Sequence, residues 1–170
     1  GGAVSVRELT SDAHATWDAF VRERPDGTFF HLSGWKRVIE ASFAHRCFYL
    51  MAYRGDRLVG VMPTTFVASR LFGRALISNG FAVQGGPLAT DADAASALHA
   101  TAADICDRRG AHYFECRGDP GESSPAWRAQ EGLYAAFRKP ISSDHDANMK
   151  AIPRKQRAMV RKGQQNGLTS

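Results

Sequence analysis

Residues 29–65 constrain the fold most strongly, because they predict a helix and two strands in unbroken succession. Ser33 is suited to the N-cap position of the helix, and apolar residues follow it at the spacing of one helical face. That face consists of Trp35, Val38, Ile39 and Phe43. The polar face consists of Lys36, Arg37 and Glu40. The helix is therefore expected to pack on a core through its apolar face.

Two apolar runs, residues 47–53 and 58–63, come next and are separated by a short polar segment. Within that segment, Gly55 can adopt the positive φ that a tight turn requires. The two runs are therefore predicted to form an antiparallel hairpin directly after the helix.

The rest of the chain alternates between strand-like and helix-like patterns. Strands are predicted at residues 4–9, at 64–69 as a continuation of the hairpin, at 75–78 resuming at 81–84, at 111–117 and at 133–139. Helices are predicted after a cap at residues 10–12, at 91–109 with Gly110 at its end, at 125–130 and over the basic C-terminal segment. This order predicts an α/β or α+β fold with a mixed sheet, not a parallel doubly wound one.

The 170 residues, 44% of them hydrophobic, suffice for one sizeable core and are too few for two ordinary domains. There is no run of 18 apolar residues and no secretory signal pattern at the start, so a cytoplasmic protein without a membrane span is expected. Cys47, Cys106 and Cys116 are odd in number and far apart. They fit neither a disulfide framework nor a zinc site.

Positive charge is concentrated at the C-terminal end of the chain. Residues 1–137 carry 14 Lys or Arg against 15 Asp or Glu, whereas residues 138–170 carry 8 against 2. On one continuous helix, four of these cations would share one face: Lys150, Arg154, Arg157 and Arg161. Pro153 either kinks this helix or starts a new one. The stripe indicates an anion-binding surface, although a solvated surface helix gives the same pattern.

The helix and hairpin of residues 29–65 and the basic segment MKAIPRKQRAMVRKGQQNGL resemble the N-terminal part of the FemAB-like proteins. These are GNAT-related transferases that pass acyl or aminoacyl groups to an amine, and the chain is most similar to members associated with exosortase and PEP-CTERM export systems. The resemblance implies a single-domain GNAT-like fold over residues 1–143, with a basic helix at 144–167 packed on it. Family members have two such halves in tandem, so a second half is expected to be missing here.

Coenzyme A-binding GNAT proteins hold the pyrophosphate with a Gln/Arg-x-x-Gly-x-Gly/Ala segment at a helix N-terminus. Residues 70–75, RLFGRA, match these letters but precede a predicted strand, so we interpret the match as an accidental turn. No cofactor is therefore expected. Aminoacyl-tRNA is the donor that agrees with the resemblance, while acyl-CoA stays open.

Candidate substrate-binding residues are Trp35, Lys36, Gln84, Gly85, Gly86, Glu115 and Arg117. The first two lie where the family has its Trp-containing helix, and the glycines resemble its Gly-Gly-Pro segment, which a ligand can approach closely. Glu115 shares a strand face with Arg117, as an acid/base with a cationic neighbour. Each group also has a structural alternative. Trp35 and Lys36 would be a core Trp beside an exposed Lys, and the glycines would form a structural turn. Glu115 and Arg117 would form a structural ion pair.

Asp144, His145 and Asp146 have the letters of metal ligands, but consecutive residues at a helix start cannot all converge on one ion. They are better explained, with Ser143, as helix-capping groups. No metal site is expected, and no set of nucleophile and base identifies a catalytic residue.

The sequence thus predicts the acceptor-side half of a FemAB/GNAT-like transferase, which passes an acyl or aminoacyl group to an amine of a cell-envelope or exopolysaccharide precursor. A phosphorylated envelope precursor or aminoacyl-tRNA is the expected partner, and no DNA partner is expected. The alternative is a non-catalytic module that binds RNA or another anionic partner through its basic helix. If a second half is required for activity, the isolated chain is expected to be inactive.

Overall fold

The structure, a computed structural model, describes residues 2–69, 71, 73–118, 127–130, 137 and 139–168. The chain divides into two compact units, Gly1–Ala129 and Gln130–Ser170. The elements of the first unit are β1 (Val4–Glu8), α1 (His14–Glu23), the 3₁₀ turn η1 (Phe29–His31), α2 (Ser33–Phe43), β2 (Arg46–Arg54), β3 (Arg57–Ser69), β4 (Gly73–Ser78), β5 (Leu88–Ala89), α3 (Ala92–Arg108) and β6 (Tyr113–Glu115).

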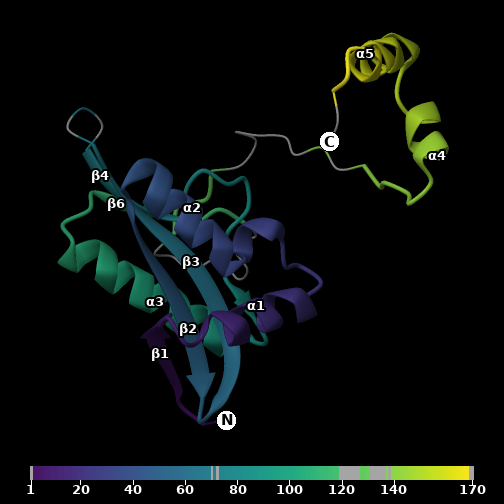
Figure 1. Cartoon of the computed structure of the whole chain (residues 1–170). Helices are drawn as coiled ribbons and strands as arrows, with labels where there is room; N and C mark the ends of the chain where they lie inside the picture. The colour runs from purple at the N-terminus through teal and green to yellow at the C-terminus, as the bar shows by residue number, and fades with distance from the viewer. Residues whose placement is uncertain are drawn as a thin grey trace. The chain divides into compact units, whose positions relative to one another are not determined.

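One mixed sheet forms the centre of this unit, with the strand order β1-β2-β3-β4-β6 and with β5 paired to β3 beside this path. The described strand pairs are antiparallel, apart from the parallel pair of β4 and β6. α3 covers one face of the sheet, and α1 and α2 cover the other (Figure 1). The predicted mixed α/β sheet is therefore confirmed.

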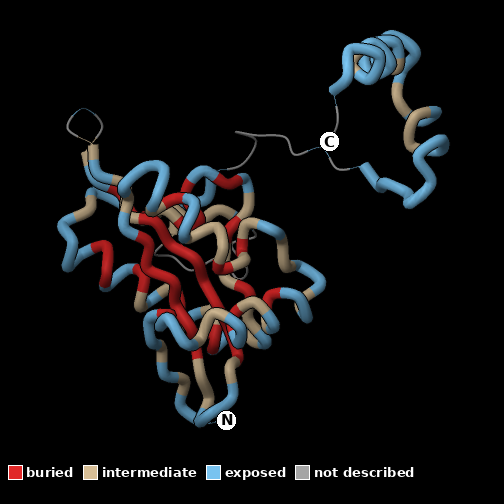
Figure 2. The backbone as a smooth tube through the Cα atoms, in the orientation of Figure 1, coloured by how far each residue is buried: buried red, intermediate tan, exposed pale blue. Residues whose placement is uncertain are grey.

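Side chains alternate between the two faces of β2 and β3 and so divide the core into two parts. The part under α3 includes Phe48, Leu50, Met62, Leu76 and Leu98. The part under α1 and α2 includes Trp17, Ile39, Tyr49, Met51 and Val61. Figure 2 shows the central strands buried along most of their length. Burial on both faces explains why residues 47–53 are continuously apolar instead of alternating.

The predicted hairpin is confirmed, with longer strands than expected and with Gly55 at a φ of 61° in its turn. Two local predictions are wrong. Residues 81–84 do not resume a strand, because residues 79–87 form a loop between β4 and β5. α1 begins at His14 and has no side-chain cap, although residues 10–12 predicted one.

The start of α2 also differs from the prediction. Ser33 is the first helical residue and not the N-cap, which is Leu32. The Ser33 N–H instead donates to Oδ1 of Asp18 on α1, at 2.7 Å. A carboxylate from a neighbouring helix therefore replaces the local cap.

α2 is rotated relative to the predicted orientation. Ile39 is fully buried, but Val38 and Phe43 of the predicted apolar face are 44% and 47% exposed. Lys36 and Glu40, predicted to be on the polar face, are half-buried. Half of the predicted contact face is therefore wrong, and part of the apolar surface of α2 remains exposed.

α3 has the ends that the sequence predicts. Asp91 is the N-cap and accepts a hydrogen bond from the Ala94 N–H at 3.0 Å, while Gly110 follows the helix with a φ of 59°. Arg54 at the end of β2 donates two hydrogen bonds to the Asp91 carboxylate, at 3.0 and 3.1 Å. The hydrogen bonds from Arg54, together with the one from the Ala94 N–H, hold the pKa of Asp91 well below its usual range.

The second unit contains α4 (His145–Lys150) and α5 (Arg154–Gln165), separated at Pro153. Of the two predicted alternatives, the structure has the one in which a new helix starts at Pro153, and Lys150 belongs to α4. Arg154, Arg157 and Arg161 remain on one face of α5, since they are three and four residues apart. Asp144 caps α4 as predicted, accepting from the N–H groups of the residues two and three positions later.

Residues 127–130 have no helical structure, while residues 125 and 126 and most of the strand predicted at 133–139 lie outside the described residues. The first unit ends at Ala129. The predicted domain boundary near residue 143 stays a prediction. The packing of a basic helix on the first unit stays a prediction. In the part of the chain that the structure describes, we find no helix of the length and hydropathy needed to cross a membrane.

Candidate functional site

The parallel strands β4 and β6 end side by side, with Ile77 paired to Glu115 at the last step of the register. Beyond that step, different contacts join the two segments. The Arg117 N–H donates to Ser78 Oγ at 2.7 Å, and the Arg117 C=O accepts from the Gly85 N–H at 2.9 Å. A loop of residues 79–87 therefore lies at the carboxyl ends of two parallel strands, the edge of a sheet where ligand sites commonly form.

Asn79 anchors this 79–87 loop to the segment that precedes α2. It is fully buried and adopts a φ of 54°, a conformation that Asn tolerates better than most residues. Its Nδ2 donates to the Phe30 C=O at 2.6 Å. Trp35 on α2 adds a second connection, because its Nε1 donates to the Gly80 C=O at 3.2 Å.

His31 adds a third connection and its tautomer can be assigned. Its Nε2 lies 3.1 Å from the Gly86 carbonyl oxygen, which can accept but not donate, so Nε2 carries the proton. Nδ1 then accepts from the Thr28 hydroxyl at 2.8 Å. Burial lowers the pKa of His31 and so favours this neutral form.

The structure brings together most of the predicted site residues around the 79–87 loop: Trp35, Gln84, Gly85, Gly86, Glu115 and Arg117. The glycines make close contacts with the protein itself. A Cβ at Gly85 would lie 2.0 Å from the Asn79 Cβ, and one at Gly86 would lie 3.4 Å from the Arg117 carbonyl oxygen. The contact with Asn79 accounts for Gly85, whereas 3.4 Å is an ordinary contact distance that does not require a glycine at position 86. Contact of either glycine with a substrate stays a prediction.

Glu115 and Arg117 form the ion pair that the sequence offered as an alternative. Arg117 Nε donates to Glu115 Oε1 at 2.6 Å, and Arg117 Nη1 donates to the Ala82 C=O of the loop at 3.0 Å. The Glu115 and Arg117 side chains remain 41% and 33% exposed. The arrangement holds a carboxylate in a fixed orientation while leaving it accessible to a ligand.

Lys36 does not join this group. Its Nζ donates to Glu40 Oε1 at 2.6 Å, and the same oxygen accepts from the Cys47 N–H at 3.2 Å. Lys36 thus has an intramolecular partner on its own helix, and its contact with a substrate phosphate stays a prediction.

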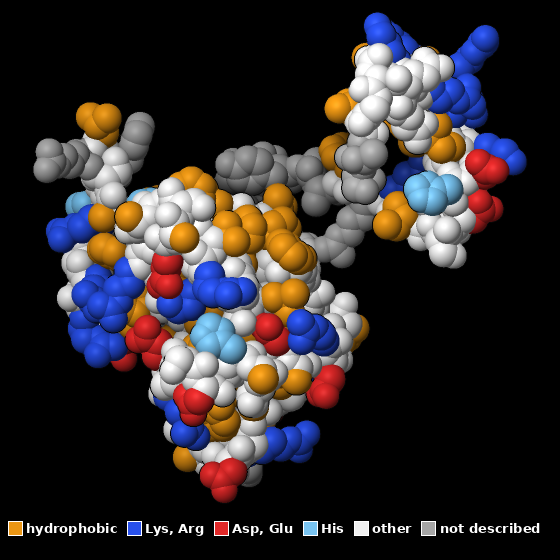
Figure 3. Space-filling view, in the orientation of Figure 1, with side chains coloured by type: hydrophobic (Ala, Val, Ile, Leu, Met, Phe, Trp, Pro, Cys, Tyr) orange, Lys and Arg blue, Asp and Glu red, His pale blue; other side chains and the backbone are white. Residues whose placement is uncertain are grey.

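An aromatic rim beside the loop gave no clear signal in the sequence. The rim consists of Phe29, Phe43 and Phe81, which are 68%, 47% and 50% exposed. The rings of Phe43 and Phe81 stack with centroids 4.1 Å apart. Figure 3 shows hydrophobic side chains at the surface over α2. The sequence feature that could have indicated this rim is Phe81, an aromatic residue inside a glycine-rich loop, where core packing does not require an aromatic ring.

The N-terminus of α3 is already occupied by carboxylates. Asp91 accepts from the Ala94 N–H there, and Asp93 lies in the first turn. Arg54 pairs with both carboxylates, at 3.0 Å from Asp91 and 3.9 Å from Asp93. A phosphate at this position would have to compete with the Asp91 carboxylate for the N–H groups of the helix. The RLFGRA segment leads into β4, as predicted, although Arg70 and Phe72 lie outside the described residues.

Cys116 and His99 form a pair that the sequence did not indicate, with Sγ 3.6 Å from Nε2. Burial raises the pKa of Cys116 and lowers that of His99, so the neutral thiol and imidazole are favoured. This is the opposite of an activated thiolate. Among the described residues, no group of three or more potential ligands could hold a metal ion.

Three solved structures with similar folds are acetyltransferases. An aminoglycoside acetyltransferase from an uncultured soil metagenomic sample is 17% identical, with a TM-score of 0.56 over 82% of this chain and 99% of that chain. An aminoglycoside N-acetyltransferase solved with CoA is 13% identical, with a TM-score of 0.56 over 83% and 97%. A ribosomal-protein-alanine N-acetyltransferase from Brucella melitensis biovar Abortus 2308 is 13% identical, with a TM-score of 0.55 over 81% and 100%.

No family model matches the sequence, and no curated protein matches it. Similarity at identities this low establishes the fold and not the activity. The specific resemblance to FemAB-like proteins stays a prediction. The predicted fold class is confirmed: the chain has the mixed α/β fold of GNAT-family acetyltransferases.

Proposed function

We propose that the protein is an N-acyltransferase whose acceptor amine reacts beside Glu115. The observation that supports this proposal is the position of the Glu115–Arg117 pair. It places an accessible, oriented carboxylate at the carboxyl end of β6, in a fold shared with N-acetyltransferases. A carboxylate within hydrogen-bonding distance of an amine can serve as a general base.

In the proposed step, the acceptor nitrogen attacks the acyl carbonyl carbon and the bond from that carbon to the leaving oxygen or sulfur breaks. Glu115 takes the proton that the nitrogen loses, and the leaving group takes a proton from solvent. Arg117 donates to Oε1 of Glu115 at 2.6 Å, and in this proposal the second carboxylate oxygen accepts the proton from the amine. Arg117 is in turn fixed by the Ala82 C=O, which couples the base to the 79–87 loop.

We propose an aminoacyl-tRNA as the donor in preference to acyl-CoA. The N-terminus of α3 is occupied by the Asp91 carboxylate, and Arg54 holds that carboxylate with two hydrogen bonds. A pyrophosphate therefore cannot use this helix end without displacing a charged cap. The proposed acceptor is an amine of a phosphorylated envelope or exopolysaccharide precursor, because the aromatic rim offers apolar ring faces on which a sugar can pack.

The test compares two donors on one acceptor. Radiolabelled aminoacyl-tRNA from a total charged tRNA pool, or acetyl-CoA, is incubated with the chain and glucosamine 1-phosphate, and labelled amide is counted. We expect transfer from the tRNA pool and a loss of at least about 100-fold for Glu115→Gln. Glu23→Gln, which changes an exposed carboxylate on α1, is the matched control and should keep full activity. Full activity in Glu115→Gln, or no transfer from either donor, contradicts the proposal.

A second candidate function rests on α5. The helix carries Arg154, Lys155, Arg157, Arg161 and Lys162 and has no acidic residue in its first turn. We propose, as the alternative, that this helix binds RNA. Affinity for a single-stranded RNA should then fall steeply with salt, and each Arg→Ala change on the helix should reduce the slope of log K against log salt by about 1. A slope unchanged in Arg154→Ala and Arg161→Ala would refute it.

A further inference from the structure

A cavity of about 430 Å³ lies on the α3 face of the sheet, between β1, the start of β2 and the end of α3. Its apolar walls come from Val6, Phe48, Leu50 and Ile105. Its charged residues are Arg7, Glu8, Arg46, Arg108 and Arg109. Phe48 belongs to the core on the α3 side of the sheet. Glu115 is the register partner of Ile77 in the neighbouring strand, so both side chains lie on the same face, which is the face opposite to α3. The cavity is thus separate from the site proposed for acyl transfer.

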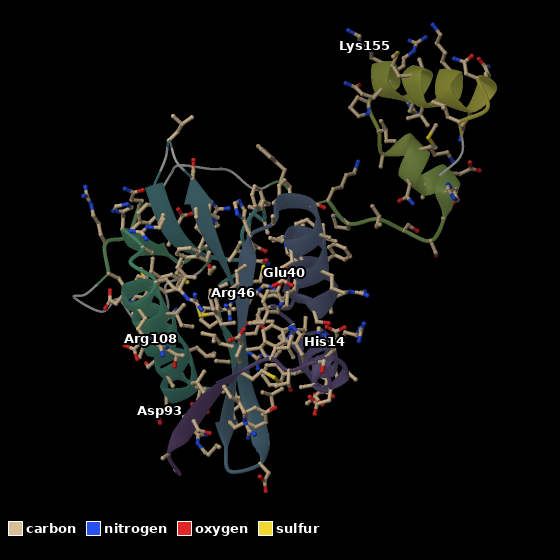
Figure 4. All side chains as sticks on the ribbon, turned by 60° about the vertical axis from the view of Figure 1, so that its left-hand side comes forward. His14, Glu40, Arg46, Asp93, Arg108 and Lys155 are labelled. Atoms are coloured by element: carbon tan, nitrogen blue, oxygen red, sulfur yellow. The ribbon has the colours of Figure 1, made fainter. Side chains whose placement is uncertain are left out.

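Two guanidinium groups meet on one aromatic ring in this cavity. Arg46 Cζ lies 4.8 Å and Arg109 Cζ lies 5.0 Å from the centre of the buried Phe48 ring. Cation–π contact of this kind holds a guanidinium by its flat face and leaves its edge N–H groups available. Figure 4 labels Arg46 on β2 and Arg108 on α3, and Figure 3 shows Lys and Arg side chains grouped on the α3 side of the molecule.

The arginines have no acidic partners in the described part of the chain. No carboxylate there lies within 4.0 Å of the guanidinium of Arg46, Arg108 or Arg109. Arg108 uses its Nε on the Asp104 backbone C=O, which leaves its terminal N–H groups available. Arg7 also lines the cavity, and its Cζ lies 4.0 Å from the centre of the Tyr53 ring.

The helix dipole does not account for this cluster. The C-terminal end of a helix carries about half a negative charge, which one cation already offsets. The four lining arginines, against the Glu8 carboxylate, leave the cavity with an excess of three formal positive charges. A phosphate monoester near neutral pH carries about two negative charges and accepts paired hydrogen bonds from arginine.

We propose that this cavity binds a phosphate monoester with a short apolar group. The phosphate lies among Arg46, Arg108 and Arg109, and the apolar group lies against Leu50 and Ile105. The volume is within the range of small-molecule sites. The ligand is a second ligand and not the acylated amine, because it sits on the other face of the sheet.

The test is a calorimetric titration of the whole chain with phenyl phosphate at low ionic strength. We expect saturable binding at one site. Arg46→Gln and Arg109→Gln should each weaken it at least about tenfold, the effect of losing a hydrogen bond to a charged group. Arg37→Gln is the matched control, because Arg37 is an exposed arginine on α2, on the opposite face, and should leave the affinity unchanged.

Benzoate and phenol separate the contributions of charge and ring. Benzoate, a monoanion, should bind more weakly than phenyl phosphate, and phenol should not bind measurably. Arg46→Lys keeps the charge but loses the two parallel N–H donors of the guanidinium group, and should weaken binding less than Arg46→Gln. Thermal melts of every variant check that it is folded. The proposal is overturned by absent saturation in the wild type, by equal weakening in Arg37→Gln, or by benzoate binding as tightly as phenyl phosphate.

Discussion

A glycine-to-alanine series tests whether the 79–87 loop packs as the structure describes. A Cβ at Gly85 would lie 2.0 Å from the Cβ of Asn79 and 3.1 Å from the Ser78 carbonyl oxygen. Asn79 cannot move aside easily, because its N–H donates to the Pro63 C=O at 2.9 Å and its Nδ2 to the Phe30 C=O at 2.6 Å. Gly85→Ala should therefore destabilise the fold by about 2–3 kcal/mol, as expected for overpacking of a fixed site.

Two matched variants provide the scale for this value. A Cβ added at Gly34 in α2 would have no atom within 4 Å, so Gly34→Ala should stabilise by about 0.5–1 kcal/mol through helix propensity. A Cβ at Gly86 would meet its nearest atom at 3.4 Å, and Gly86→Ala should change stability by less than about 1 kcal/mol.

Urea unfolding followed by tryptophan fluorescence measures all three variants, since the three tryptophans lie in the first unit. The midpoint should shift while the slope of the transition stays constant, which identifies a change of native-state stability. If Gly85→Ala is as stable as Gly86→Ala, then the close contact with Asn79 is not present and the described loop packing is wrong.

Three further results are expected. Tyr49→Phe should leave stability unchanged or raise it by up to about 1 kcal/mol in urea unfolding, because the buried Tyr49 hydroxyl has no partner among the described residues; clear destabilisation would indicate a buried water bonded to it. The free energy of unfolding should fall as pH decreases below about 6.5, because the pKa of His31 is lowered in the folded state and the unfolded chain binds the proton first. His31→Gln should flatten this part of the pH profile. An unchanged profile would contradict the assigned neutral tautomer. Acetyl-CoA at millimolar concentration should not raise the melting temperature, whereas a ligand at 100 times its Kd would contribute about 2.7 kcal/mol; a saturable rise would restore acyl-CoA as the donor.

The parts of the fold that the sequence predicted well carry their signals locally. Gly55 supplies the turn of the hairpin, and Asp91 and Gly110 mark the two ends of α3. Each of these residues acts on backbone groups within a few positions of itself. Local chemistry was therefore sufficient for β2, β3 and α3.

The errors occur where tertiary contacts replace local ones. Ser33 has the side chain of an N-cap, but Asp18 from α1 satisfies its N–H. Residues 81–84 have the apolar content of a strand, but Asn79 and Gly80 commit the segment to a loop fixed on η1 and α2. Such partners are distant in sequence and leave no periodic pattern.

The candidate site was predicted in part for a topological reason. Gln84, Gly85 and Gly86 follow β4, and Glu115 and Arg117 end or follow β6, so the parallel pairing of the two strands brings them together. Lys36 lies apart from them, because its pairing with Glu40 depends on the rotation of α2, which the sequence did not reveal. The aromatic rim depends on the same rotation, which exposes Phe43 to stack with Phe81.

The two ends of α3 have opposite chemistry, and this contrast bears on both proposals. The N-terminal end would attract a phosphate through the helix dipole, but Asp91 occupies it and Arg54 fixes Asp91 in place. The C-terminal end would repel a phosphate weakly, but Arg46 and Arg109 on the Phe48 ring bring two positive charges to it. At each end the side chains therefore carry charge opposite in sign to the backbone dipole. Anion binding on this face of the sheet is consequently expected at the end of α3 and not at its start, the reverse of a phosphate site built on a helix N-terminus.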